Sequence, residues 1–585
     1  MIARRNPCEL EIDLFCHGVR IDPSCRLEED ARVVARTRAG LGSGLEMIIP
    51  GGRKDIWLNA PVEEDFARSS PYSLSRDGRG YSLHDERTDE HYAVRLPEEP
   101  AWYKRTTSRG VEMGKIGVLQ GTYLGIYISN SCLFWYSDPS QNCRFCTTGS
   151  NVGVNEVAQK HLDDVVEVAR AAKRESGVTF VHFNSGYQSG RDLALAAPYV
   201  RAVKEQVGAL VGVQLYPTSD LEQYDRLIEL GADHFSFCYE FQNPEYFARY
   251  LPGKARTGGQ DLFFRALEYT AKRLGKGAVS GEIIAGVEPV EETLRAIDYI
   301  TSLGAFPTVC IFRPVIGADM ERHPVPRFEE MKRVFAHVYE ACRRNGIPIG
   351  AAPNIEVSLI VQPDDARDLA KPGLATTLYD ARLAAVRALA RPLFAWKSRR
   401  RRMPQASFDA LLARSKPAAS GASGAARTNG SAAGGSGAEA GSPTARAAIT
   451  AEAPSTSRAA RDAAIREVFD AVRTIASRRG AGFEIEERDG VLEIAPRASD
   501  DESVNRCRLK LFRPREDKDR LCAFFYKRSN LGWSRDRFSY GAVEFLPEML
   551  TREDAAAWLG WLRGGFDPER RPPRLRRAFL YSIPD

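Results

Sequence analysis

The chain has 585 residues, a formal net charge of +5 and 43% hydrophobic residues, a fraction ample for a large buried core. A charge this small on a chain this long gives no reason to expect nucleic acid or an anionic membrane as the main partner. No apolar run reaches the roughly 18 residues needed to span a bilayer, and the first residues lack the apolar stretch of a secretory signal, so we expect a cytoplasmic protein without a membrane partner.

Residues 1–115 combine short alternating runs, such as CELEIDLF and LEMIIP, with turns rich in Gly, Pro, Ser and Arg. Alternation of apolar and polar residues over such short runs is typical of half-buried strands. The sequence therefore predicts a small β-rich N-terminal unit.

Residues 116–365 alternate short apolar runs with segments of amphipathic helical spacing. The expected strands are 122–129, 178–185, 210–217, 234–240, 279–286 and 308–314. Nearly continuous apolar strands are typical of parallel strands covered on both faces. Six strand–helix units in a row predict an α/β fold, in which a parallel (β/α) sheet closes partly or fully into a barrel. A final apolar run, residues 355–362, is a candidate for one more strand.

Three further regions follow the predicted barrel. Residues 366–414 form a helical extension with a basic run at 397–402, and residues 415–460 are a low-complexity stretch typical of a flexible linker. Residues 461–585 regain structural patterning: a helix at 461–477, a hairpin turning at Asp489-Gly490, later strands, and a helix at 552–565. They predict a separate C-terminal α+β domain.

Three of the eleven cysteines, Cys132, Cys143 and Cys146, lie within fifteen residues, directly after the first expected barrel strand. In a reducing compartment, clustered cysteines are more often metal ligands than disulfide partners. Three thiolates on one loop are able to hold three irons of a [4Fe–4S] cluster and leave the fourth iron open for S-adenosylmethionine. The alternative is a structural zinc site completed by His161, although zinc sites usually use paired short spacings and no second C-x2-C is present.

The C-x2-C pair with Phe145 before its last cysteine resembles the cluster loop of the radical S-adenosylmethionine superfamily, over about residues 116–350. The usual loop is C-x3-C-x2-C, whereas here seven extra residues precede Cys143. The resemblance implies reductive cleavage of S-adenosylmethionine to a 5′-deoxyadenosyl radical that starts chemistry on an unidentified small-molecule or peptidyl substrate. It also implies an electron donor such as a flavodoxin or ferredoxin. It identifies no catalytic side chain.

The same resemblance, to lipoyl and biotin synthase-like members, assigns contacts with S-adenosylmethionine to successive strand ends. Glu240 would face the ribose hydroxyls and Arg249 the methionine carboxylate, a role open to Lys254 or Arg256 as well, since a guanidinium pairs with a carboxylate bidentately. An exposed salt bridge is the alternative for Arg249. The remaining expected contacts are Asn184, Ser185 and Gly186 after the second strand, Gly281, Ile283 and Gly286 around the fifth, and Arg313 after the sixth.

Other interpretations of the sequence stay open. An auxiliary cluster held by Cys8, Cys16 and Cys25 is one of them. The spacing of these cysteines differs from that of the N-terminal cysteine trio in lipoyl synthase-like enzymes. The basic run at 397–402 would suit an RNA-modifying enzyme of the same fold, although nucleic acid is not the expected partner. A third interpretation is a non-catalytic, metal-stabilised scaffold whose C-terminal domain recruits a partner.

Overall fold

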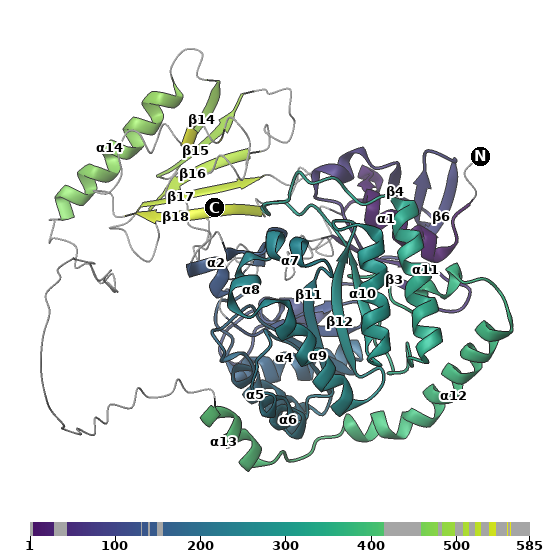
Figure 1. Ribbon diagram of the computed structural model, residues 1–585. Coiled ribbons are helices and arrows are strands. Elements are labelled where there is room, and N and C mark those ends of the chain that lie inside the picture. Colours follow the sequence, from purple (N-terminus) through teal and green to yellow (C-terminus); the bar gives the residue numbers. More distant parts are fainter. Residues whose placement is uncertain are drawn as a thin grey trace, which may run out of the picture.

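The computed structural model describes most of the chain up to residue 414 and parts of the remainder. The described residues are 4–27, 44–129, 132–137, 141–148, 152, 156–414, 458–477, 482–488, 490–497, 507–513, 521–527, 538–545, 558–559 and 562. The expected linker at 415–460 and the expected helix at 552–565 lie almost wholly outside them. The architecture is mixed α/β (Figure 1).

The central element is a seven-stranded sheet in which six neighbouring strands are parallel and an edge strand, β7, runs antiparallel to β8. In spatial order the strands are β13 (Phe306–Ile311), β12 (Val279–Ala285), β11 (His234–Glu240), β10 (Leu210–Gln214), β9 (Phe180–Asn184), β8 (Tyr123–Tyr127) and β7 (Val118–Gln120). Because β13 and β7 do not pair with each other, the curled sheet is an open half-barrel. The six expected strands and their parallel order are confirmed.

Helices follow the parallel strands and cover the outer face of the sheet (Figure 1). They are α4 (Leu162–Ser176), α5 (Asp192–Ala202), α6 (Glu222–Glu229), α7 (Pro244–Tyr250), α8 (Pro252–Thr257), α9 (Gly259–Leu274), α10 (Val290–Ser302) and α11 (Phe328–Asn345). Their apolar faces are buried, as Val165 and Val168 of α4 illustrate. Covered on one face by helices, the sheet leaves its other face to line the interior of the half-barrel.

The run CELEIDLF forms a helix, α1 (Pro7–His17), and not the strand-like segment that its alternation predicted. Asn6 caps the helix by accepting from the Glu9 amide, the Glu9 side chain returns to the Asn6 amide, and Pro7 occupies the first turn. Both faces of α1 are buried, so polar residues of the helix lie in the core. The side chain of Asp13, for example, accepts hydrogen bonds from Tyr72 at 2.6 Å and Arg5 at 2.7 Å.

The rest of the N-terminal region is β-rich, as predicted. Its strands are β1 (Arg20–Ile21), β2 (Leu45–Ile49), β3 (Ile56–Ala60), β4 (Tyr72–Asp77), β5 (Gly80–Asp85) and β6 (Glu90–Val94). They form a four-stranded sheet, β1-β4-β5-β6, and a separate hairpin, β2-β3. Buried apolar side chains from Cys8 to Leu411 belong to one continuous core. The boundary expected at residue 115 stays a prediction.

Residues 355–362 do not form the additional strand. They pass in an irregular conformation beside the edge of the sheet, where the Thr122 amide donates to the Glu356 carbonyl at 3.0 Å. Lys54 from the N-terminal region contacts Asp364 and Asp365 at 2.9 Å and Glu356 at 3.0 Å. Apolar side chains in this run are buried against the core without a strand partner.

Two helices, α12 (Leu374–Lys397) and α13 (Gln405–Arg414), form the extension after the half-barrel. The described C-terminal elements are α14 (Arg458–Ala476) and an antiparallel sheet of β14 (Phe483–Arg488), β15 (Val491–Pro496), β16 (Cys507–Phe512), β17 (Leu521–Lys527) and β18 (Phe538–Phe545). The predicted hairpin forms between β14 and β15, with Gly490 at φ +78°. Its status as a separate domain stays a prediction. Within the described residues, no helix combines the length and apolarity needed to cross a membrane.

The cap of α1 is open to a direct test. Replacing Asn6 with Ala removes the acceptor for the Glu9 amide and should weaken the first turn of α1 by about 1 kcal/mol. We expect amides of that turn to exchange with deuterium roughly fivefold faster, measured by mass spectrometry on the α1 peptide. Asn6→Asp, which keeps a capping oxygen, is the matched control; equal exchange in the two variants would contradict the assignment.

Candidate functional site

The three clustered cysteines lie on the segment that follows β8, at the carboxyl end of the parallel strands. Cys132 directly precedes the short helix α2 (Leu133–Ser137), and the Cys146 amide donates to the Cys143 carbonyl at 3.0 Å. All three side chains are half-buried. In parallel α/β sheets this end of the strands is where binding sites are found, so the sulfurs stand in the expected place for a cofactor.

Gly186, after β9, touches the cysteine segment. A Cβ at Gly186 would lie 2.3 Å from the Cβ of Cys132, closer than real side chains approach. The Gly186 amide donates to the hydroxyl of Tyr127 at 2.9 Å, and the Leu133 amide donates to the Tyr187 carbonyl at 3.0 Å. Glycine is therefore required sterically where the turn after β9 meets the loop that carries Cys132.

The sulfurs of the three cysteines are not arranged around a single ion. Zinc binds thiolate at about 2.3 Å, so three sulfurs on one ion would lie within about 4.6 Å of one another. Among the described residues, Cys132, Cys143 and Cys146 do not form a group whose ligand atoms all lie within 4.8 Å. His161, the expected fourth zinc ligand, is an exposed residue at the start of α4. A cluster of several irons, in which each sulfur binds a different metal, tolerates the wider spacing.

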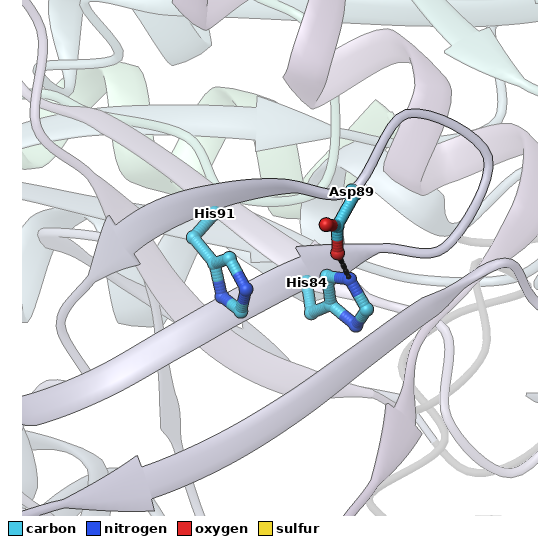
Figure 2. Close-up of side chains that lie close together, drawn as sticks. All are labelled: His84, Asp89 and His91. Atoms are coloured by element: carbon cyan, nitrogen blue, oxygen red, sulfur yellow. Dashed lines mark hydrogen bonds and ion pairs between the residues drawn. The ribbon is translucent and has the colours of Figure 1, made fainter.

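The described group that meets the 4.8 Å spacing lies elsewhere, on the hairpin of β5 and β6. Figure 2 shows His84 and His91 side by side with Asp89, whose carboxylate accepts from His84 at 2.9 Å. The Asp89 side chain is 93% exposed. The three residues belong to a different sheet from the cysteine loop, and an exposed cluster of this kind is an ordinary surface arrangement.

Helix α8 packs against the cysteine loop from the opposite side. A Cβ at Gly253 would lie 2.5 Å from the Gln141 carbonyl oxygen and 2.7 Å from the Phe134 ring. This approach brings Lys254 toward the site, where its charge acts on Cys143. Figure 1 shows α2, α7 and α8 close together at one end of the core.

Glu240 is the anionic partner of Lys254. The Lys254 ammonium donates to both carboxylate oxygens of Glu240 at 2.7 Å and to the Cys238 carbonyl at 2.6 Å. The pairing of β11 with β12 shifts register between Cys238 and Glu240, and Glu240 has φ +56°. A bulge of this type re-aims a side chain at the end of a strand. Glu240 thus points into the half-barrel because β11 is irregular there.

A cavity of about 510 Å³ runs through the half-barrel, and Phe145, between Cys143 and Cys146, lines it. Much of its polar lining comes from alternate strand positions, which are His182, Asn184, Gln214, His234, Cys238, Glu240, Ser280, Glu282, Thr308 and Cys310. The cavity therefore connects the cysteine loop to a partly polar interior, which is the arrangement that a bound cofactor and substrate require.

Burial controls the protonation of these groups. It raises the pKa of Cys132 to about 11 and the pKa of the Cys143 thiol well above its usual value. Burial also raises the pKa of Glu240 to about 7, against the opposing effect of Lys254. It lowers the pKa of His182 to about 3, which keeps this imidazole neutral. A metal that binds the thiols has to displace their protons.

Several buried polar atoms near the loop have no hydrogen-bond partner among the described residues. They are the Asn184 Oδ1, the Ser185 Oγ and the Tyr216 hydroxyl. Unsatisfied buried polar atoms are costly and rare in folded proteins, so the Asn184 oxygen, which lines the cavity, is a candidate for contact with a ligand. Asn184 and Ser185 are residues for which the sequence predicted cofactor contact.

The other expected cofactor residues are more scattered. Gly281 faces the outer helices, because a Cβ there would lie 2.8 Å from Ile300. Gly286, at φ +96°, packs on Pro326, and the Arg313 side chain donates to the Asn59 carbonyl at 2.7 Å. Ile283 is buried and lines the cavity.

Arg249, the expected carboxylate ligand, is exposed at the end of α7 above the ring of Tyr250, at 5.3 Å. The structure brings Lys254 to Glu240, so this lysine takes the place beside the acid. The roles of all these residues toward S-adenosylmethionine stay predictions.

Sequence reasoning missed the polar face of the strands. Cys238 and the buried Cys310 both line the cavity, and Cys238 donates to Glu282 at 2.9 Å. Gln214 and Ser236 also donate to Glu282. The available signal was a polar residue at every second position within runs that appeared uniformly apolar.

Comparison with known proteins gives one informative relative. No family model matches the chain. Bacteriochlorophyllide c C-7(1)-hydroxylase from Chlorobaculum limnaeum is 26% identical over 299 residues, which cover 46% of this chain and 72% of the relative. A solved radical S-adenosylmethionine methyltransferase from Kitasatospora setae, with tryptophan and aza-SAM bound, has a TM-score of 0.29 and 12% identity, covering 55% of this chain and 72% of that chain. A TM-score this low supports no inference.

Breaking the buried pair of Lys254 and Glu240 by removing one partner should measurably destabilise the protein. Lys254→Met leaves the Glu240 carboxylate buried without its cation, and we expect a loss of about 3 kcal/mol in the free energy of unfolding. Adding Glu240→Gln should recover part of the loss, as measured by urea unfolding. The matched control is Arg226→Met, which breaks an exposed pair with Glu229 and should cost less than about 1 kcal/mol. Similar losses in the two single variants would argue against a buried pair.

Proposed function

The chain is an enzyme of the radical S-adenosylmethionine superfamily, and from this membership we propose that Cys132, Cys143 and Cys146 hold a [4Fe–4S] cluster with one open iron. The open iron of such a cluster would hold S-adenosylmethionine and would supply the electron for its reductive cleavage. Similarity to the hydroxylase and the C-x10-C-x2-C loop support the membership. The observation that carries the proposal is the placement of three half-buried thiols on one loop at the carboxyl end of six parallel strands.

The donor set fits an iron–sulfur cluster better than zinc. Thiolates are the usual ligands of such clusters, and three of them leave one iron without a protein ligand. The wide spacing of the sulfurs and the exposure of His161 both oppose a single tetrahedral ion. Lys254, which favours the thiolate of Cys143, offsets part of the negative charge that three thiolates bring into a buried site.

The turn after β9 fits S-adenosylmethionine beside the cluster. Gly186 lets the backbone approach Cys132, and the unsatisfied oxygens of Asn184 and Ser185 are free to accept from a ligand's ammonium or hydroxyl groups. Glu240 lies across the cavity, held by Lys254. Contacts with S-adenosylmethionine from Gly281, Gly286 and Arg313 then come from backbone groups. Arg249 reaches the methionine carboxylate only if α7 moves.

When bound, the cluster and S-adenosylmethionine supply a 5′-deoxyadenosyl radical that abstracts hydrogen from a C–H bond. The protein's own residues orient the substrate and enclose it. Phe145 lines the cavity beside the sulfurs, and neutral His182 and hydrogen-bonded Glu282 line the interior without adding a free charge. Such a cavity excludes water from reactive intermediates.

The substrate is a molecule with an unactivated C–H bond that enters this cavity. The relative is named for hydroxylation of a bacteriochlorophyllide, which supports oxidation at a carbon atom of a largely apolar compound as the reaction type. A flavodoxin or ferredoxin supplies the electron in a reducing cytoplasm. No described feature favours the RNA-modifying or scaffold alternatives.

Loss of any one of the three cysteines should abolish cluster assembly. After anaerobic reconstitution with iron and sulfide, we expect about four irons per chain and 5′-deoxyadenosine on addition of reductant and S-adenosylmethionine. Cys132→Ala, Cys143→Ala and Cys146→Ala should lose both. Cys342→Ala, at a buried cysteine of α11, is the matched control and should retain them. A colourless wild-type protein with one bound zinc would refute the proposal.

The contact between Gly186 and Cys132 makes a second prediction. Gly186→Ala places a methyl group 2.3 Å from the Cβ of Cys132, so the loop that carries Cys132 has to move. This substitution should reduce bound iron and sulfide more than tenfold. Gly78→Ala, whose Cβ meets nothing within 4 Å, is the matched control. Bound iron and labile sulfide are measured after reconstitution. Normal loading of Gly186→Ala would show that the turn after β9 does not support the cluster loop.

A further inference from the structure

The outer face of α12 carries large apolar side chains that no described residue covers. Its large apolar side chains are 51–80% exposed, and within the described residues they account for all exposed large hydrophobics: Leu374, Leu378, Leu389, Leu393 and Trp396. Helical spacing places them within an arc of roughly 100°, in one group near the start of the helix and one near its end, with exposed Arg382 in the same arc between the two groups. Figure 1 shows α12 at the periphery of the core.

Small residues broaden this apolar stripe. Ala381, Ala385, Ala388 and Pro392 are exposed between the large side chains. The opposite face of α12 packs on the core through Tyr379 and other buried residues. Several exposed large apolar side chains on one helix face are uncommon on a soluble protein and mark a site of interaction with a protein or a membrane.

Positive charge accompanies the stripe. Between residues 374 and 402 the sole acidic residue is Asp380, which pairs with Arg367 at 2.8 Å. The basic residues in this range are Arg382, Arg387, Arg391, Lys397, Arg399, Arg400, Arg401 and Arg402. Exposed Arg399, Arg400 and Arg402 have no ion-pair partner in the described part of the chain. The charge is concentrated at the end of the helix next to Trp396.

The end of α12 is fixed to the core, so the stripe has a defined orientation. Lys397 pairs with Asp233 at 3.3 Å, and the buried Lys204 ammonium donates to the Lys397 carbonyl at 3.2 Å. The Arg401 guanidinium lies 4.3 Å from the centre of the Trp396 ring. A tryptophan beside arginines is typical of a helix end at a membrane–water interface.

We propose that α12 and residues 398–402 dock the protein on an anionic lipid surface, with the leucine stripe in the lipid boundary and the arginines on the headgroups. The exposed leucines fit the apolar boundary of such a surface, and the adjacent basic cluster fits its anionic headgroups. A second copy of the chain would bring like charges together. RNA would neutralise the arginines but leave the leucines in water.

Docking is peripheral and does not depend on the proposed radical chemistry. The inner side of α12 lines the cavity through Val386, Ala390 and Phe394, so docking would bring that wall of the cavity to the lipid boundary. The expectation of no membrane partner rested on the lack of a bilayer-spanning apolar run and of a secretory signal, and on the small net charge of the whole chain; that net charge conceals the local excess of positive charge at this helix.

The test is flotation of the full chain with vesicles of phosphatidylcholine, with and without phosphatidylserine. We expect binding to the anionic vesicles that weakens at high salt. Leu378→Glu with Leu389→Glu should reduce the bound fraction at least tenfold, since two apolar groups leave the lipid. Replacing Arg399, Arg400 and Arg402 with Gln should also reduce it, because headgroup contacts are lost.

Two matched controls test whether binding depends specifically on the leucine stripe of α12. Thr377→Glu adds a charge to the exposed side of α12 outside the leucine stripe, and Arg265→Gln with Lys272→Gln removes exposed charges from α9. Both should bind like wild type. Binding that is unchanged in Leu378→Glu/Leu389→Glu would overturn the proposal. So would a dimer that these substitutions convert to a monomer, or tighter binding to an RNA oligonucleotide than to vesicles.

Discussion

The approach of Gly186 to Cys132 is the contact on which the arrangement of the site depends. Two loops that follow neighbouring parallel strands, β8 and β9, meet there with no room for a Cβ. Tyr127, the last residue of β8, fixes the distance by accepting the Gly186 amide at 2.9 Å. Cys132 is thereby fixed at the start of the cysteine loop, and α8 packs on that loop where Gly253 approaches Gln141 and Phe134.

The inner face of the half-barrel is partly polar, as expected of a sheet face that lines a ligand cavity. Many side chains at alternate positions of the strands are polar, and Gln214, Ser236 and Cys238 donate to Glu282. Glu240 is the exception, because a bulge turns it toward Lys254. A buried ion pair of this kind adds little net stability but fixes the orientation of both groups. The cavity thus combines a hydrogen-bonded polar interior with the ion pair of Glu240 and Lys254.

The parallel fold was predictable from the sequence because each strand and helix carries its own periodic signal. The helical state of CELEIDLF was not, since the burial of Asp13 depends on Tyr72, a partner distant in sequence. The cysteines and Gly186 were predicted as site residues from their spacing and from the resemblance, and their roles stay predictions. Lys254 was ranked below Arg249 because the bulge that aims Glu240 leaves no local signal. The stripe on α12 was missed because helical spacing does not tell which apolar face remains uncovered.

Anomalous diffraction from crystals of the anaerobically purified chain tests the central claim most directly. With data collected above the iron and zinc edges, the account predicts a compact iron peak bonded to the sulfurs of Cys132, Cys143 and Cys146, with one corner free of protein ligands. A single zinc peak among these sulfurs, or iron bound at other residues, would contradict it.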